Sequence, residues 1–309
     1  MSAQGALSWA AAEASSRQCP LHVVHAFSWP SIGNGLDMGF ILDTNLGLQS
    51  AAEWIVADAE AQARGLAPDV KVMATLIVGP PAPTLLSEAQ NADLVVVGGR
   101  GVGGFRGLLV GSVSATVAAH APCPVVVVHP HAGGTAFPAS PTGRIVVGMD
   151  GSATSAAAIR FAFQQAARRR IGITAVHAAL PTRQYGSFQV PPEIVDQVER
   201  QLFAEAMQSK RVLVPGIDVR TKLMHGHPAQ ALIDASAGAE MVVVGSRGRG
   251  GFAGMLLGSV SQAVLQHAAC PVAVVRPYSP PSVVAPSPGR LRLAAATARD
   301  GISDLKELS

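Results

Sequence analysis

The sequence contains no uninterrupted apolar run of the roughly 18 residues that a membrane-spanning helix needs, although 49% of its 309 residues are hydrophobic. The apolar segments are short, rich in valine and separated by glycines. Met1 leads into a mixed Ala/Ser/Glu stretch that lacks the basic start and apolar block of a signal peptide. These absences predict a soluble protein of the cytoplasm that has no membrane partner.

Cysteine and charge are also scarce. The three cysteines, Cys19, Cys123 and Cys270, do not have the spacing of metal ligands. Proline follows Cys123 and Cys270, which favours small buried core residues in a reducing compartment. The net charge of +3 is too small to indicate a nucleic-acid partner, and no basic stripe alternates with aromatic residues.

The chain does contain an internal repeat. Residues 241–275 read MVVVGSRGRGGFAGMLLGSVSQAVLQHAACPVAVV, and residues 94–128 read LVVVGGRGVGGFRGLLVGSVSATVAAHAPCPVVVV. Each copy has the pattern of a buried strand, a glycine-rich loop, a helix and a second buried strand. The corresponding glycines lie 147 residues apart in the sequence. Two copies in a chain of this length predict two domains.

Changes in composition along the chain indicate where the boundaries of the two domains lie. We expect a first domain at 1–130, a linker at 131–143 that is rich in Pro, Gly, Ser and Thr, and a second domain at 144–277. The tail at 278–309 begins with Pro and Ser and ends in a short amphipathic piece. Histidine pairs at 129/131 and 225/227 have metal-like spacing, but we interpret them as linker, structural or solvent-exposed residues, with no metal.

Expected strands alternate with expected helices, and the strands are continuous valine-rich runs. This pattern is typical of an α/β fold with a parallel sheet that is covered by helices on both faces. The second domain contains five expected strands and four helices, with strands that include 144–149, 173–178 and 217–224. The first domain contains four strands. Aligning His25 with His177 places Met1 near Ala153, so the first domain as written lacks its first strand.

The missing strand has three explanations. The true start of the protein lies upstream of Met1, or the domain is degenerate and incomplete, or a tail segment such as 290–294 fills the gap. Without the strand, the two strands that flank the gap would expose unpaired edges. We favour the first explanation and regard the third as the least favoured.

Three loops of the second domain follow the carboxyl ends of strands, where open parallel sheets bind ligands. They are Asp150-Gly151-Ser152, His177-Ala178 and the glycine loop at 245–259. Glycines let the backbone come close to a ligand, so that free N–H groups and the start of the following helix can surround phosphate oxygens. Further donors to such an anion are Ser259, Ser261, Arg247 and Arg249. The alternative interpretations are that the glycines serve tight turns, that Asp150 caps the next helix, and that His177 is a packed strand-end residue.

Two common phosphate loops are disfavoured. The Walker pattern requires Lys-Ser/Thr after its last glycine, and neither loop contains a lysine. The dinucleotide fingerprint follows the first strand of its unit, whereas these loops follow the fourth expected strand.

The spacing G-x2-G-x9-G-[S/T] fits both loops. Together with VVGMDGS and the terminal CPVAVV, it makes the chain resemble a tandem universal stress protein, up to about residue 277. The resemblance implies two open five-stranded parallel sheets of order 3-2-1-4-5. It also implies ATP as the ligand, accompanied by Mg²⁺, because this glycine pattern marks the ATP-binding members of the family.

The resemblance also assigns roles to residues. It implies that Asp150 holds the ribose, Ala178 lines the adenine pocket, and Val244 and Gly245 pack by the ribose. The phosphate cradle would consist of Gly248, Gly258, Ser259 and Val260. The matching residues of the first domain are Ala26, Val97, Gly98, Gly101, Gly111, Ser112 and Val113, and no residue there matches the aspartate. The family's dimer contact runs through the last strand, so the strands at 125–128 and 272–275 are expected to pair within the chain or in a homo-oligomer.

The sequence therefore predicts a nucleotide-binding stress regulator in which ATP occupancy biases conformation or association. No base–nucleophile pair suited to rapid hydrolysis is visible, so we do not expect an enzyme, and slow hydrolysis stays open. One alternative is an interaction module that no longer binds nucleotide and dimerises through its terminal strands. Another is a related nucleotide-using enzyme, such as an adenylyl-transferring one, for which a substrate site and acid/base residues are not apparent.

Overall fold

The computed structural model describes residues 2–28, 38–99, 110–129, 143–179, 216–249, 256–277 and 291–295, with isolated positions between 184 and 203. These residues form two compact units. Unit 1 comprises Met1–Phe137 together with Pro281–Ser309, and unit 2 comprises Pro138–Pro280. The expected linker at 131–143 lies outside the described residues, apart from its last position.

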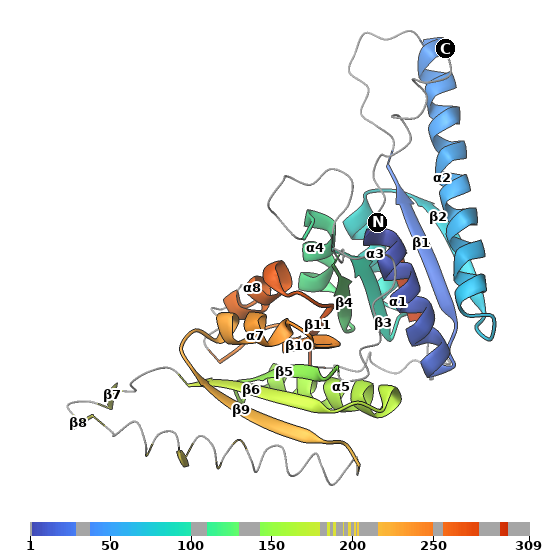
Figure 1. The fold of residues 1–309 in the computed structure, drawn as a ribbon. Coiled ribbons are helices and arrows are strands. Elements are labelled where there is room, and N and C mark those ends of the chain that lie inside the picture. Colours follow the sequence, from blue (N-terminus) through green and yellow to red (C-terminus); the bar gives the residue numbers. More distant parts are fainter. Residues whose placement is uncertain are drawn as a thin grey trace. The chain divides into compact units, whose positions relative to one another are not determined.

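Unit 2 contains a five-stranded parallel sheet (Figure 1). Its strands are β5 (Ile145–Met149), β6 (Ile173–Ala179), β9 (Val219–His225), β10 (Met241–Gly245) and β11 (Val272–Val275). The order across the sheet is β9-β6-β5-β10-β11, which is 3-2-1-4-5 when the strands are counted along the unit. The α/β architecture expected from the valine-rich strands is confirmed.

The helices of unit 2 that the structure describes are α5 (Ala153–Arg169), α7 (Pro228–Ser236) and α8 (Ser259–His267). A short antiparallel pair, β7 (Gln184–Tyr185) and β8 (Phe188–Gln189), follows β6 in the sequence. The strands β10 and β11 are buried throughout, except at Gly245. Burial on both faces explains why their sequences are continuous valine runs rather than alternating ones.

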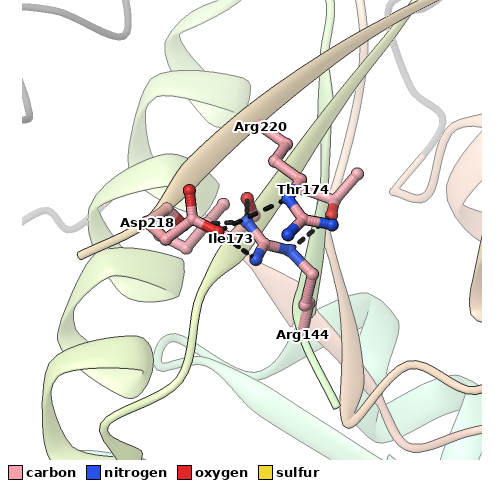
Figure 2. A network of polar contacts seen from close by, with 5 residues as sticks. All are labelled: Arg144, Ile173, Thr174, Asp218 and Arg220. Atoms are coloured by element: carbon pink, nitrogen blue, oxygen red, sulfur yellow. Dashed lines mark hydrogen bonds and ion pairs between the residues drawn. The ribbon is translucent and has the colours of Figure 1, made fainter. Parts of the chain in front are cut away.

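An arginine joins three strands at the amino-terminal edge of this sheet (Figure 2). The Arg144 guanidinium donates hydrogen bonds to Asp218 Oδ2 at 2.6 Å, to the Ile173 carbonyl at 2.6 Å and to Thr174 Oγ1 at 3.0 Å. A Cβ on Gly172 would contact the Arg144 guanidinium, so a larger residue there would displace it from these bonds. The network therefore holds the starts of β5, β6 and β9 together.

From its first helix onward, unit 1 repeats the order in which the sheet strands and helices of unit 2 follow one another along the chain. It contains α1 (Ser2–Arg17), β1 (Leu21–Phe27), α2 (Met38–Leu66), β2 (Val72–Val78), α3 (Pro81–Ala89), β3 (Leu94–Gly98), α4 (Ser112–His120) and β4 (Val125–Val128). The helices α1 and α5 end alike, because Gln18 and Arg170 both adopt the left-handed conformation, with φ of 51° and 56°. No described helix in either unit combines the length and hydropathy needed to cross a bilayer.

The centre of the unit 1 sheet is filled by β12 (Leu291–Ala295), which comes from the tail. The order is β2-β1-β12-β3-β4, and β12 runs parallel to both of its neighbours. Leu291 pairs in register with Leu21 on β1 and with Leu94 on β3. No strand precedes α1 among the described residues, so the structure fills the gap in the way that the sequence analysis favoured least.

Candidate functional site

The candidate site lies at the carboxyl edge of the unit 2 sheet, between β5 and β10. These adjacent strands mark the point where the strand order reverses, since β5 leads to β6 on one side and lies against β10 on the other. Asp150 directly follows β5, and residues 246–249 directly follow β10. Open α/β sheets bind ligands in the crevice outside such a point.

Asp150 connects these two loops. Its Oδ1 accepts a hydrogen bond from the Ser152 N–H at 2.9 Å, and its Oδ2 accepts one from the Arg249 N–H at 3.0 Å. The cap of α5 is Ser152, whose Oγ accepts from the Ser155 N–H at 3.1 Å. The interpretation of Asp150 as the helix cap is therefore wrong, because a serine two residues later satisfies the first turn and leaves the carboxylate to hold the glycine loop.

Two glycines of the loop are required by close packing. A Cβ on Gly248 would lie 2.5 Å from Asp150 Oδ2, and a Cβ on Gly245 would lie 2.8 Å from Thr154 Oγ1 and 2.9 Å from its backbone carbon. Gly151 has φ of +77°, and a Cβ there would lie 2.1 Å from Nη2 of Arg249. Gly258 differs, because its nearest contact would be an ordinary 3.4 Å to the Arg247 Cα. Packing thus explains Gly245 and Gly248 but not Gly258.

The start of the loop is anchored on both sides. The Ser246 N–H donates to the Val275 carbonyl at 2.8 Å, and the Gly258 N–H donates to the Ser246 carbonyl at 2.8 Å. Thr154 Oγ1 donates to the Arg247 carbonyl. Thr154 was not singled out in the sequence analysis, although its position in the first turn after Asp150-Gly151-Ser152 is the signal that would have pointed to it.

Serine hydroxyls near the loop have two different roles. Ser261 is buried, and its Oγ donates to the Gly245 carbonyl at 2.6 Å. The expectation that Ser261 supplies a donor to a ligand is therefore wrong, because its proton serves the backbone of the loop. Ser259 is exposed at the first position of α8, and Gly258 before it makes no side-chain cap. The first turn of α8 thus presents N–H groups and a hydroxyl to one side of the loop.

Three arginines lie around the loop. Arg247 and Arg249 are exposed. Arg276 follows β11, and its Nη2 donates to the Leu256 carbonyl at 3.4 Å. Burial and, to a smaller extent, the like charge of Arg247 lower the pKa of Arg276. Arg276 was missed in the sequence analysis because it lies outside the glycine pattern, although it directly follows the last strand.

The other residues assigned by the resemblance lie near strand ends. Val244 is buried at the end of β10, Ala178 is half-buried near the end of β6, and Val260 is half-buried in the first turn of α8. His177 lies beside Ala178, where its Nδ1 is 2.7 Å from the Met149 carbonyl and its ring is 5.7 Å from that of Phe203. These contacts agree with the interpretation of His177 as a packed residue.

The loop of unit 1 is anchored in the same way. Ser114 Oγ donates to the Gly98 carbonyl at 2.6 Å, and the Gly111 N–H donates to the Gly99 carbonyl at 2.7 Å. Ser112 is exposed and Val113 half-buried at the start of α4, while Ala26 and Val97 are buried in β1 and β3. Gly101 lies outside the described residues.

Unit 1 differs from unit 2 in its charged groups. His129, which is buried, takes the place that Arg276 has in unit 2. Ala295 pairs with His25 as Met149 pairs with His177, so Ala295 is the counterpart of Met149. The next residue, Ala296, lies outside the described residues, but the sequence places an alanine there where unit 2 has Asp150.

No group of three or more His, Cys, Asp or Glu side chains suited to a metal ion occurs within the described parts of the chain. His227 is exposed, whereas the side chain of His225 and the whole of His131 lie outside the described residues. Cys123 and Cys270 are buried, as expected, and burial raises the pKa of both thiols to about 12.

Comparisons with known proteins agree with this architecture. The model of the universal stress protein family matches twice, at residues 2–129 and 141–276. A universal stress protein of Mycobacterium tuberculosis is 34% identical over 281 residues, which cover 89% of this chain and 92% of the relative. One of Mycobacterium bovis is 34% identical over 288 residues, with 89% and 94% covered.

Among solved structures, a universal stress protein from Archaeoglobus fulgidus DSM 4304 superposes with a TM-score of 0.65. Its sequence is 19% identical, and the match covers 88% of this chain and 93% of that one, which supports the fold. Two matches to the family model and relatives aligned over most of their length lead to one conclusion: the chain belongs to the universal stress protein family, with two domains of that family in tandem.

Proposed function

We propose that unit 2 binds ATP, that each chain binds one nucleotide, and that occupancy biases conformation or association instead of supporting rapid turnover. The observation that carries the proposal is the contact between Asp150 and the glycine loop at the switch point of the sheet. A carboxylate that can accept bonds from ribose hydroxyls lies directly beside a loop and helix start that can bind phosphates.

The ribose part of the proposal rests on Asp150. Its two oxygens already accept N–H groups from Ser152 and Arg249. Each carboxylate oxygen can accept more than one hydrogen bond, so a ribose hydroxyl can join or replace the Arg249 N–H. If the hydroxyl replaces it, residues 247–249 move with the ligand. Val244, Gly245 and Ala178 would then line the nucleoside.

The phosphates would lie at the start of α8. Gly248, Ser259 and Val260 offer backbone N–H groups, Gly258 lets the phosphates come close to the chain, and the helix dipole favours negative charge there. The exposed Arg247 and Arg249 supply positive charge. Mg²⁺ commonly binds nucleotides through their phosphates with few protein ligands. The absence of an acidic cluster in the described residues fits such an ion, with the exposed Ser259 hydroxyl as a ligand.

The proposal assigns ATP a regulatory role. Asp150 is engaged by two backbone N–H groups, and Ser261 is engaged by the Gly245 carbonyl, so neither forms a base–nucleophile pair. We place this role in the cytoplasm. The strands β4 and β11, which end the two domains, are the surfaces through which we expect the domains or separate chains to associate.

The test replaces Asp150 with asparagine and measures ATP affinity by isothermal titration calorimetry. Asp150→Asn keeps the shape of the side chain but replaces a charged acceptor by an amide, so we expect a loss of at least tenfold, or about 1.4 kcal/mol. The matched control is Asp234→Asn, because Asp234 is exposed on α7. Equal affinity in the wild-type chain and the Asp150 variant would contradict the proposed site.

In unit 1, the residue at the position that corresponds to Asp150 supports a different role for the domain. Since the sequence has Ala296 after β12 where unit 2 has Asp150 after β5, we propose that unit 1 acts as an interaction module without a nucleoside site. A Gly258→Glu variant separates the two roles, because it places a negative charge at the phosphate cradle of unit 2. Cellular function that is unchanged in this variant would favour the interaction role for the whole chain.

A further inference from the structure

The central strand of unit 1 and the helix that should follow it come from distant parts of the sequence. In unit 2, β5 leads into α5 through Asp150, Gly151 and Ser152. In unit 1, the corresponding strand is β12 at 291–295 and the corresponding helix is α1 at 2–17. β12 is therefore held in the sheet by its neighbours and by the tail that carries it, without a short connection to α1.

We propose that the space between β1 and β3 is a binding site for an extended peptide segment, and that residues 291–295 of the same chain occupy it as a detachable ligand. This inference does not depend on nucleotide binding. A segment added between two strands gains main-chain hydrogen bonds on both edges and places alternate side chains in the layers above and below.

The sequence of the tail fits the site. In the sequence, Arg290, Leu291 and Leu293 repeat the pattern of Arg144, Ile145 and Val147. The register of β12 aligns Leu291 with Ile145 and Leu293 with Val147. In unit 2, Ile145 and Val147 are fully buried. The neighbours of β12 are also buried, with Leu21 on β1 and Leu94 on β3 both 0% exposed. An apolar residue at every second position is what such a site requires.

One residue makes β12 a weaker strand than β5. Arg292 takes the place of Val146, which is 3% exposed in unit 2. In register it lies between His22 on β1 and Val95 on β3. A charged residue is costly at a position that the sister domain buries, so the segment is expected to bind less tightly than an integral strand.

The tether decides which copy of the tail occupies the site. Residues 278–290 connect β12 to unit 2 and include four prolines and three serines. A tether of this kind gives an effective concentration of about a millimolar. At micromolar protein, the chain's own tail therefore competes far better than the tail of a second copy.

The experiment inserts a protease recognition sequence between Val284 and Ala285 of the full-length chain and cleaves the folded protein. We expect fragment 285–309 to co-elute with the rest of the chain on gel filtration at micromolar concentration and to separate on dilution. All three tryptophans belong to unit 1, and Trp9 is 6% exposed on α1, which contacts β12. Release of the fragment should therefore shift tryptophan emission to longer wavelength.

Leu293→Pro in the cleavable chain removes a strand N–H and an apolar side chain, so its fragment should separate without dilution. Leu308→Pro makes the same change outside β12 and should leave co-elution intact. Because the wild-type chain is cleaved after folding, a second readout needs no variant: a fluorescent peptide of residues 285–309 should exchange into the cleaved protein and gain anisotropy.

Three results would overturn the proposal. The first is immediate separation of the wild-type fragment with unchanged tryptophan emission and unchanged thermal unfolding of unit 1. The second is equal retention of the wild-type and Leu293→Pro fragments. The third is an uncleaved dimer that becomes monomeric on cleavage, which would place the tail in a second copy.

Discussion

At the scale of single residues, the site depends on one carboxylate with two backbone partners. Asp150 was identified from its position after a strand, but its bond to the Arg249 N–H was not. The backbone of residues 246–249 is positioned by the hydrogen bond from Thr154 to the Arg247 carbonyl and by the close contacts at Gly245 and Gly248. These contacts join residues almost a hundred positions apart, and no local pattern in the sequence reports them.

Gly248→Ala tests that contact. The added methyl group would meet Asp150 Oδ2 at 2.5 Å, so the carboxylate or the loop must shift and the Arg249 N–H bond is lost. We expect ATP affinity, measured by calorimetry, to fall about tenfold, or by 1.4 kcal/mol. Gly65→Ala is the matched control, since nothing lies within 4 Å of its added methyl group and it lies outside the site. Equal losses in both variants would contradict a specific role for the Asp150 contact.

The buried thiols make a prediction about pH. The pKa of Cys123 and Cys270 is raised from 9.0 to about 12 in the folded chain. The unfolded chain therefore releases these protons first, and the free energy of unfolding should decline as pH rises from about 9 towards 12. Replacing both cysteines with alanine should weaken this alkaline decline in chemical denaturation.

The same burial protects the thiols from modification. In the native protein at pH 8, a thiol reagent should modify the half-buried Cys19 well before Cys123 and Cys270. Rapid labelling of all three cysteines would show that the two thiols are accessible in the folded state.

At the scale of helices and strands, the sequence predicted more of the fold than of the site. The strands of 144–149 and 173–178 agree with β5 and β6 to within a residue, because short, mostly apolar runs of this length are typical of buried strands. The helix α3 begins at Pro81, since proline is well suited to the first turn of a helix. β12 was least predictable, because its pairing partners lie about 200 or more residues away.

Arg144 provides a test at this scale. Arg144→Met keeps the length of the side chain but removes the bonds to Asp218, Thr174 and the Ile173 carbonyl (Figure 2). Without Arg144, the partly buried Ile173 carbonyl loses its charged donor. This loss should lower the free energy of unfolding of unit 2 by about 2 kcal/mol, measured by urea denaturation. Arg160→Met, on the exposed face of α5, is the control. A midpoint equal to that of the control would contradict the role of the network.

The network also makes unit 2 sensitive to acid. Hydrogen bonds from Arg144 hold the pKa of Asp218 below its ordinary value of 3.8. The contribution of the pair is therefore present above pH 3.8 and is lost as pH falls through the lower pKa of the folded state.

At the scale of the whole molecule, two similar domains differ in the charged groups of the site. Both keep the loop anchored by a serine and a glycine, at Ser114 and Gly111 in unit 1 and at Ser261 and Gly258 in unit 2. In unit 2 the loop contacts Asp150, whereas the residue that follows β12 in the sequence is Ala296. The repeat in the sequence predicted two related domains, and the comparison of their charged groups argues for one nucleoside site.

The most direct test of this account is the stoichiometry of ATP binding to the full-length chain, measured by isothermal titration calorimetry with Mg²⁺ present. The account predicts one ATP per chain, and at least tenfold weaker binding to the Asp150→Asn chain. Two equivalent sites per chain, or one site that Asp150→Asn leaves intact, would contradict it.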